Sequence, residues 1–448
     1  MDISTAALMS IIALVVLVAI SCVNDDLHVG FLGIGFAILV GGIWGNLTGS
    51  KVMSSFPLSL FMILVGVTFL FGLAQTNGTM EKLTAYSVRL CKGNTTWIPF
   101  IIFMLTTFIA TIGPGNIAGC ALIAPVAMAI ATRVNMPAFL MTLIVVGAAN
   151  GAAFSPVAPT GIISNGIIAK IAPALAIPAD QLNWLAWKIH FNAEVAQTFV
   201  NIGGFLLMGG LAWIRSQKGQ ELDIDELAPK PAPFTRGQLI TLAMIALLIL
   251  LVVIPGLPGI KGTLPKTFTN MLSNVGSISF ILAVVLMLTG SGDSKAAIKV
   301  MPWGVIMMVC GVSVLIDVMD KAGGLKFLVN IMASVSGPVS INFWVSFVPA
   351  VISAYSSSSG VVVPMFLPMV PGLVELTKGD PIAIITSINV GAHLVDTSPL
   401  STLGALCIAS AGEHEDKNKL FRKLLIWGLS MSIVSGIVCY FFFGVLGL

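Results

Sequence analysis

The stretch "VGAHLVDTSPLSTLGALCIAS", residues 390–410, inserts a polar segment into an otherwise apolar part of the chain. His393, Asp396 and Ser398 lie among Val, Leu and Ala, and Pro399 ends a helix that enters the segment. A helix that breaks there must find partners for the backbone groups that the break sets free. The stretch therefore predicts an interrupted helix whose broken ends face a polar space.

The composition indicates what surrounds this break. The chain has 448 residues, of which 57% are hydrophobic and 9% are charged, and its mean hydropathy is +1.01. So few charges cannot cover a soluble globule of this size. Apolar segments of about 18 residues or more recur without a two-residue alternation, so we predict an all-α protein that crosses a lipid bilayer. The first segment, 6–23, has no Lys or Arg before it, which favours a spanning helix over a cleaved signal peptide.

Ten spanning segments are predicted, two of them interrupted. They are 6–23, 27–45, 57–75, 137–171 (interrupted), 192–214, 236–254, 270–289, 302–320, 381–411 (interrupted) and 422–447. Two further apolar stretches, 97–132 and 339–376, have polar breaks at their middle, "TIGPGNIAG" and "AYSSSSGVV". Each half is about 15 residues and would span poorly, so we predict re-entrant hairpins with buried tips. Pairs of short helices joined by a loop in water are the alternative.

Four identical residue pairs lie 243 positions apart, which indicates an internal repeat. The pairs are Pro125 and Pro368, Ser155 and Ser398, Pro156 and Pro399, and Gly161 and Gly404. We divide the chain into a first repeat at 1–215, a charged, Pro-rich linker at 216–236 and a second repeat at 237–448. Five crossings and one hairpin per repeat would insert the second repeat upside down, as an inverted-topology repeat.

The basic residues predict the orientation. Of the 22 Lys and Arg residues, fourteen fall on the side that holds the linker and eight on the other side. The positive-inside rule makes the linker side cytoplasmic. Both termini then lie outside, the first hairpin enters from the cytoplasm and the second enters from outside.

The hairpin tips and interrupted helices are expected to meet at the membrane midplane. Helix N-termini suit a carboxylate, and free carbonyls at helix C-termini suit Na+. The candidate substrate-binding residues are Asn116, Ser155, Pro156, Ser358, Ser359, Ser398 and Pro399. The candidates for cation binding or coupling are Gly113, Gly115, Asn116, Thr160, Gly161, Ser358, His393, Asp396, Thr397, Thr402 and Gly404.

These polar stretches hold no Lys or Arg, so an anionic substrate would need helix N-termini, hydroxyl groups and a bound cation. Symport with a cation follows most simply. Asp396 and His393 can share a helix face, either as coupling groups or as a hydrogen-bonded pair with Asp396 capping the next helix. The six Cys are scattered singly, which predicts no disulfide framework, no cofactor and no metal beyond a possible Na+.

Three segments resemble a known family. They are "FPLSLFMILVGVTFLFGLAQTNGT" at 56–79, "AFSPVAPTGIISNGI" at 153–167 and "DTSPLSTLGAL" at 396–406, and they are similar to MatC-type bacterial dicarboxylate carriers, typified by malonate permeases. The wider superfamily includes divalent anion to sodium symporters with a Ser-Asn-Thr motif at each hairpin tip. Only Asn116 and Ser358 match that motif here, which leaves room for a different anion or coupling ion.

The resemblance also implies an architecture that composition and spacing alone do not indicate. It implies a homodimer in the bacterial inner membrane, with a scaffold from the early helices of each half. The hairpins and interrupted helices would form a transport domain that moves as an elevator. With both termini outside, they would lie in the periplasm.

The sequence thus favours a secondary active transporter that moves a small dicarboxylate, of the malonate or C4 type, with Na+ or H+. A monocarboxylate, sulfonate or gluconate-type permease is the alternative, because polar helix ends do not distinguish strongly between an anion with one carboxylate and an anion with two. A cation/proton antiporter needs a buried carboxylate at its centre. Asp396 is the only good candidate, and the first half offers no equivalent, so an antiporter is disfavoured. An enzyme is not expected, because HExxH, GxGD aspartate and nucleophile motifs are absent from the sequence, and no nucleic-acid partner is expected.

Overall fold

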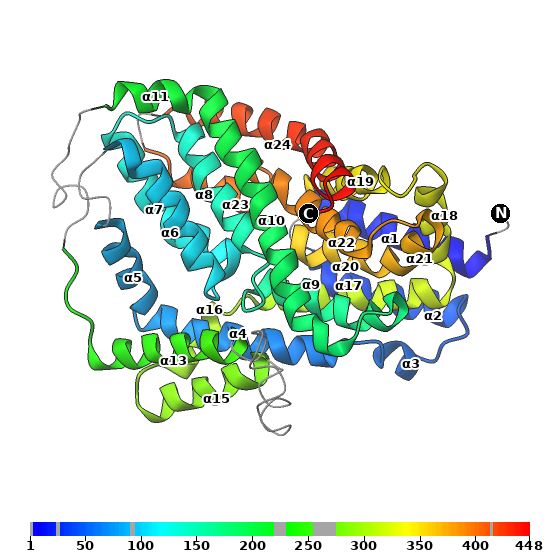
Figure 1. Cartoon of the computed structure of the whole chain (residues 1–448). Coiled ribbons are helices and arrows are strands. Elements are labelled where there is room, and N and C mark those ends of the chain that lie inside the picture. The colour runs from blue at the N-terminus through cyan, green and yellow to red at the C-terminus, as the bar shows by residue number, and fades with distance from the viewer. Residues whose placement is uncertain (1–2, 24–26, 90–94, 219–229, 254–274, 413–414) are drawn as a thin grey trace.

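The computed structural model describes residues 3–23, 27–89, 95–218, 230–253, 275–412 and 415–448, and within these ranges every regular element is a helix (Figure 1). Before the linker the helices are α1 (Thr5–Val23), α2 (Val29–Ile43), α3 (Gly49–Met53), α4 (Leu58–Thr76), α5 (Thr79–Val88), α6 (Ile98–Thr111), α7 (Gly115–Arg133), α8 (Ala138–Ala152), α9 (Pro159–Ile171), α10 (Leu182–Phe205) and α11 (Leu211–Ser216). After it they are α13 (Arg236–Val253), α15 (Val275–Leu288), α16 (Ser294–Val300), α17 (Trp303–Lys321), α18 (Gly324–Ser334), α19 (Ile341–Ser353), α20 (Val363–Phe366), α21 (Val370–Thr377), α22 (Pro381–Leu394), α23 (Thr402–Ser410) and α24 (Lys417–Cys439).

Six helical runs are long and apolar enough to cross a membrane. They are Leu58–Thr76, Gly115–Arg133, Ala179–Ser216, Trp303–Lys321, Ser358–Thr377 and Lys417–Val445. The remaining described apolar helices are shorter, among them α2, α8 and α15. Several apolar helices of this kind indicate a multi-pass membrane protein.

The ranges with polar breaks each contain two or more helices. Residues 97–132 hold α6 and α7, and residues 137–171 hold α8 and α9. In the second half, 339–376 holds α19 and a π-helical turn, Ser358–Val362, that continues into α20 and α21. Residues 381–411 hold α22, a 3-10 turn and α23. The depth of these breaks in a bilayer stays a prediction.

Some predicted boundaries differ or lie outside the described residues. The predicted span 192–214 belongs to a longer helical run that begins at Leu182, because the mixed polarity of residues 182–191 hid its first turns. Residue 254, the segment 270–274 and most of the linker, 219–229, lie outside the described ranges.

The two halves pack against each other through their early helices. Helix α2 lies along α17, and α4 lies along α15, with α13 beside α15 (Figure 1). Helices α6, α7 and α8 form a separate group of neighbours, and α24 packs on α19 and α22. Two of these pairs, α2 with α17 and α4 with α15, therefore join one helix from each half, whereas α13 and α15 both belong to the second half.

The α2–α17 contact depends on glycine. A Cβ atom at Gly30 would meet the backbone of Met307 and Met308, and a Cβ atom at Gly311 would meet the backbone of Gly30. Small residues let helix backbones approach in this way, and the approach increases the van der Waals contact that holds helices together in lipid. The two glycines set the distance between the helices.

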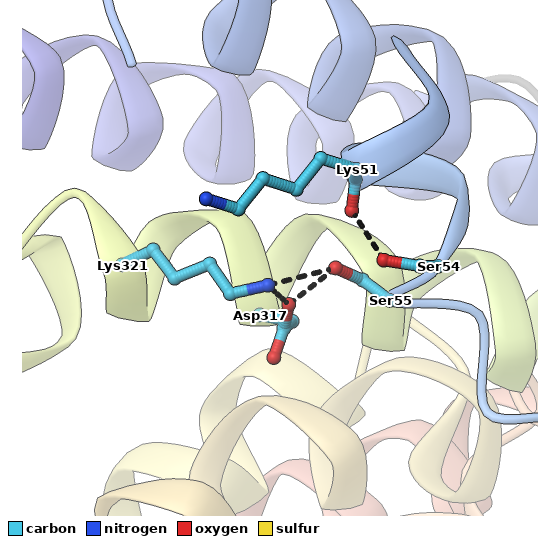
Figure 2. Close-up of polar contacts among 5 residues, drawn as sticks. All are labelled: Lys51, Ser54, Ser55, Asp317 and Lys321. Carbon is cyan, nitrogen blue, oxygen red and sulfur yellow. Dashed lines mark hydrogen bonds and ion pairs between the residues drawn. The ribbon is translucent and has the colours of Figure 1, made fainter. Parts of the chain in front are cut away.

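A polar contact joins α17 to the loop between α3 and α4 (Figure 2). The Lys321 Nζ lies 2.5 Å from Asp317 Oδ2 and 3.1 Å from Ser55 Oγ, which also donates to Asp317. The Lys321 and Asp317 side chains are 42% and 41% exposed. Such an exposed ion pair contributes about 0–1 kcal/mol, so it orients the loop before α4 more than it stabilises the fold.

We expect Gly311→Ala to lower the free energy of unfolding, measured in mixed micelles, by about 1–3 kcal/mol, because its new methyl group meets backbone that cannot give way. Gly35→Ala on α2 is the control, since a Cβ atom there meets nothing within 4 Å. The control variant should raise the free energy of unfolding, by no more than about 1 kcal/mol. Equal effects of the two variants would contradict the close-packed α2–α17 contact.

Candidate functional site: a cavity at four helix N-termini

A cavity of about 660 Å³ lies where the broken helices meet. Four helical segments start at its wall: α7 at Gly115, α9 at Pro159, the run that begins at Ser358, and α23 at Thr402. Their first-turn residues Asn116, Thr160 and Ser359 line the cavity, as does Thr402 itself. The positive ends of four helices therefore converge on one space.

Three of these N-termini have no side-chain cap. Pro114, Ala158 and Ser401 occupy the capping positions of α7, α9 and α23 without a side-chain hydrogen bond to the first turn. The run at Ser358 differs in being capped by Ser357 Oγ, which accepts from the Gly360 N–H at 3.1 Å. Uncapped first-turn N–H groups are donors that a bound anion can satisfy. In α9 the Gly161 N–H already donates to the Ala153 carbonyl at 2.9 Å, and Pro159 has no N–H, so this helix offers fewer donors than α7 and α23.

The first hairpin tip owes its shape to two glycines. Gly113 has φ of +143° and Gly115 has φ of +75°, in the region that L side chains rarely adopt. A Cβ atom at Gly113 would also overlap the ring of Phe71 on α4. The tip therefore turns sharply against α4 and directs the start of α7 at the cavity.

Seven of the residues predicted from the sequence line the cavity. They are Gly113, Asn116, Thr160, Ser358, Ser359, Asp396 and Thr402. The others do not line it, namely Gly115, Ser155, Pro156, Gly161, His393, Thr397, Ser398, Pro399 and Gly404.

Two serines outside the wall hold the broken backbone. Ser155 Oγ donates to the carbonyl of Thr111 at 2.8 Å, which ties the first break to the first hairpin. Ser398 Oγ accepts from the Leu400 N–H at 3.3 Å, within the second break. Both side chains are fully buried. In this conformation they satisfy backbone groups, and their role as substrate ligands stays a prediction.

The second hairpin tip is hydrogen-bonded to the second interrupted helix. Ser358 Oγ donates a hydrogen bond to Asp396 Oδ1 at 2.7 Å. Ser359 Oγ lies 3.0 Å from His393 Nε2 and 2.9 Å from Thr160 Oγ1, so it also reaches the start of α9. His393 and Asp396 thus contact two neighbouring residues of the second hairpin tip, Ser359 and Ser358.

The same kind of contact occurs in the first half. Asn116 Nδ2 donates to Asn150 Oδ1 at 3.3 Å, joining the first tip to α8. Asn116 and Ser359 are 243 positions apart, and so are Asn150 and His393. Asn150 Nδ2 also donates to the carbonyl of His393 at 2.9 Å, which links the two interrupted helices.

Several cavity residues were not predicted from the sequence. His28 caps the start of α2, with its Nδ1 accepting from the Gly30 N–H at 3.2 Å, and it lines the cavity together with Gln75 and Tyr355. A polar residue at the first turn of an apolar span was the available signal for His28. None of the described residues that line the cavity is Lys or Arg.

Comparison with known proteins indicates the class of protein to which this fold belongs. The chain shares its fold with a transporter from Alcanivorax borkumensis, described as "Crystal structure of the Alcanivorax borkumensis YdaH transporter reveals an unusual topology", at a TM-score of 0.58 and 17% identity, over 98% of each chain. Residues 4–153 match a family model described as "Dicarboxylate carrier protein MatC N-terminus", which confirms the resemblance to MatC-type carriers over those residues. No curated protein matches the chain. Together, the match and the fold indicate a membrane transporter rather than an enzyme.

We expect Asn150→Leu to destabilise the protein by about 1–3 kcal/mol, because it leaves the buried His393 carbonyl and the Asn116 amide without their partner. Asn183→Leu, at a half-buried position on α10, is the control: it removes a single half-buried hydrogen bond, from Nδ2 to the Val252 carbonyl at 3.2 Å, and should cost no more than about 1 kcal/mol. Denaturant unfolding in mixed micelles would measure both. A loss at Asn150 no larger than at Asn183 would argue against the link between the interrupted helices.

Proposed function

We propose that the protein is a secondary active transporter that moves a small dicarboxylate, of the malonate or C4 type, together with a cation. The observation that carries the proposal is the convergence of four helix N-termini on a cavity without a described Lys or Arg. The family matched by residues 4–153 is named for dicarboxylate carriers, which agrees with this substrate class.

The charge of the cavity suits a dianion. Each helix N-terminus is equivalent to about half a positive charge, so four of them supply roughly two. A dicarboxylate carries two negative charges that such a site would balance without a basic side chain. The volume of about 660 Å³ accommodates a small dicarboxylate with water or a cation beside it.

The position of the cavity supports an elevator mechanism. Its wall combines residues of early helices, such as Thr68 and Gln75 on α4 and Met308 on α17, with the hairpin tips and interrupted helices. We propose that the early helices form a scaffold and that the tips move with the substrate. The paired contacts α2–α17 and α4–α15, and the matching tip contacts of Asn116 and Ser359, support an inverted repeat.

The remaining features of the proposal follow from the sequence and the resemblance. We propose a homodimer in the inner membrane, with both termini in the periplasm and the linker in the cytoplasm. Cysteine labelling of intact cells at residues near each terminus would test the orientation, and labelling from the cytoplasmic side alone would overturn it.

Uptake by proteoliposomes tests the function. Labelled malonate and succinate would be offered with an inward Na+ gradient and an inward proton gradient separately, and with unlabelled substrate inside for exchange. We expect saturable uptake that small dicarboxylates inhibit more strongly than monocarboxylates. Stronger competition by monocarboxylates or sulfonates would replace the dicarboxylate assignment, and no exchange of any C3 to C6 carboxylate would overturn the proposal.

A bulky side chain in the cavity should block this uptake. Ala118 on α7 lines the cavity, whereas Ala121, one turn further along, is exposed and does not. We expect Ala118→Phe to reduce dicarboxylate exchange at least tenfold, because the ring fills substrate space, and Ala121→Phe to leave exchange within about twofold. Similar rates for the two variants would show that the substrate passes elsewhere.

A further inference from the structure

A second pocket, of about 410 Å³, lies at the start of α4, whereas the cavity at the four helix N-termini is lined by the later turns of that helix. Its wall consists of residues 54–60, which lead into α4, of Lys170 in the last turn of α9, and of Asp317 and Lys321 at the end of α17. Figure 2 shows the part of this wall where Ser55, Asp317 and Lys321 meet. None of these residues belongs to the site described above.

The second pocket repeats one end of the first cavity. Five of its lining residues stand 245 positions away from five residues that line the first cavity. The pairs are Ser55 and Val300, Pro57 and Pro302, Ser59 and Gly304, Leu60 and Val305, and Asp317 and Gly72. The same offset relates the bounds of α4 and α17, and a proline precedes the first residue of each helix. The second pocket is therefore the counterpart of the cavity end formed by the start of α17 and the end of α4.

That end of the first cavity lies on the face that holds the linker. Gln75, at the end of α4, and Met80, at the start of α5, both line it. Lys82, on α5, donates from Nζ to the carbonyl of Pro233 at 3.0 Å, which ties this end to the linker. Helix α4 has 19 residues and is thus about 28 Å long. The second pocket, at the other end of α4, lies towards the opposite face.

Helix α9 leads from the first cavity to the second pocket. Thr160 lines the cavity and Lys170 lines the pocket, and ten residues of helix separate their backbones by about 15 Å. Leu60 on α4 packs on α9 between them, because a Cβ atom at Gly166 would lie 3.0 Å from its Cδ1. Leu60 is buried, whereas its counterpart Val305 lines the first cavity. The packing of α4 on α9 therefore separates the pocket from the cavity.

The second pocket has an excess of positive charge. Lys170 and Lys321 line it with one carboxylate, that of Asp317. Lys321 pairs with Asp317, whereas Lys170 forms no ion pair with another described residue. Lys51 on α3 lies close to this wall, since its carbonyl accepts from the Oγ of the lining residue Ser54 at 2.8 Å (Figure 2). A concave surface with this charge attracts small anions.

We propose that the second pocket binds the dicarboxylate at the outer end of the transport path, with Lys170 as the main contact and Lys321 as the second. The inference rests on the proposed function and adds a binding site that the substrate meets before the helix N-termini. The volume of the pocket accommodates a small dicarboxylate with its hydration water. Movement of α9 along α4 would release the contact of Leu60 and join the pocket to the cavity.

The Asp317 carboxylate competes with the anion for Lys321. A bound dicarboxylate must share or replace the contact between Lys321 Nζ and Asp317 Oδ2 at 2.5 Å. Loss of the Asp317 charge should therefore strengthen binding of the anion, and loss of the Lys170 charge should weaken it. A purely structural role of these exposed side chains predicts no such opposite effects.

The first test measures the dicarboxylate concentration that gives half-maximal uptake, in right-side-out and in inside-out membrane vesicles. Lys170→Gln should raise this concentration about two- to fivefold in right-side-out vesicles, the range for one exposed ion pair, and should change the maximal rate less. The concentration should stay the same in inside-out vesicles, where the substrate enters from the linker face. Lys326→Gln, at an exposed position on α18 that lines neither cavity, is the control and should match the wild-type protein.

Two further variants and the salt dependence sharpen this test. Lys170→Arg keeps the charge and should behave as the wild-type protein does, and Asp317→Asn should lower the half-saturating concentration. Salt at about 1 M reduces the Debye length to about 3 Å and should remove the difference between the wild-type protein and Lys170→Gln. Equal effects in both vesicle orientations, or a rise in the half-saturating concentration with Asp317→Asn, would overturn the inference.

The second test detects binding without transport. Ser59 is exposed and lines the second pocket, so a membrane-impermeant maleimide should label Ser59→Cys. We expect malonate to slow this labelling at least twofold, and the added change Lys170→Gln to remove the protection. Protection by phosphatidylglycerol but not by malonate would assign the lysines to a lipid headgroup and overturn the inference, as would labelling that neither anion slows.

These outcomes are distinguishable from failure of the proposed function. If the wild-type protein exchanges no carboxylate, the dicarboxylate transporter proposal fails, and protection of Ser59→Cys by malonate still decides whether the pocket binds the anion. If exchange occurs with the same half-saturating concentration in Lys170→Gln as in the wild-type protein, the function stands and the second binding site fails.

Discussion

The requirement that every backbone group inside a bilayer has a partner underlies the rest of this structure. Unbroken helices meet it by themselves, and broken helices meet it only where other breaks, or a cavity, supply the partners. Ser155 reaches across to the carbonyl of Thr111, and Asn150 reaches the carbonyl of His393. The breaks therefore gather in one place, and the groups that stay free at their N-termini are available to a ligand.

Sequence reasoning found the breaks because Pro, Gly and Ser clustered within an apolar run interrupt a helix. It also found Asn116, Thr160, Ser358 and Asp396, which line the cavity. It could not separate serines that face the cavity from a serine such as Ser155 that supports backbone, because that depends on the direction in which each segment leaves its break. The backbone contact of Gly30 was equally hidden, since it requires knowing which helices of the two halves are neighbours.

Two contacts at equivalent spacing in the two halves are made with different chemistry. Asn116 and Asn150 in the first half are matched by Ser359 and His393 in the second, and both pairs join a hairpin tip to an interrupted helix. Asp396 has no polar counterpart, because the position 243 residues earlier is alanine. The cavity therefore has a carboxyl group at this position in the second half and none at the corresponding position in the first.

The positive pole of the cavity belongs to the main chain, and this has consequences for its chemical and evolutionary behaviour. A backbone N–H keeps its partial charge at every pH, so acidity acts on the site only through its side chains and through the anion itself. No exchange of one side chain removes this pole. Residues around it can vary and retune which anions fit, while the attraction for negative charge persists unchanged.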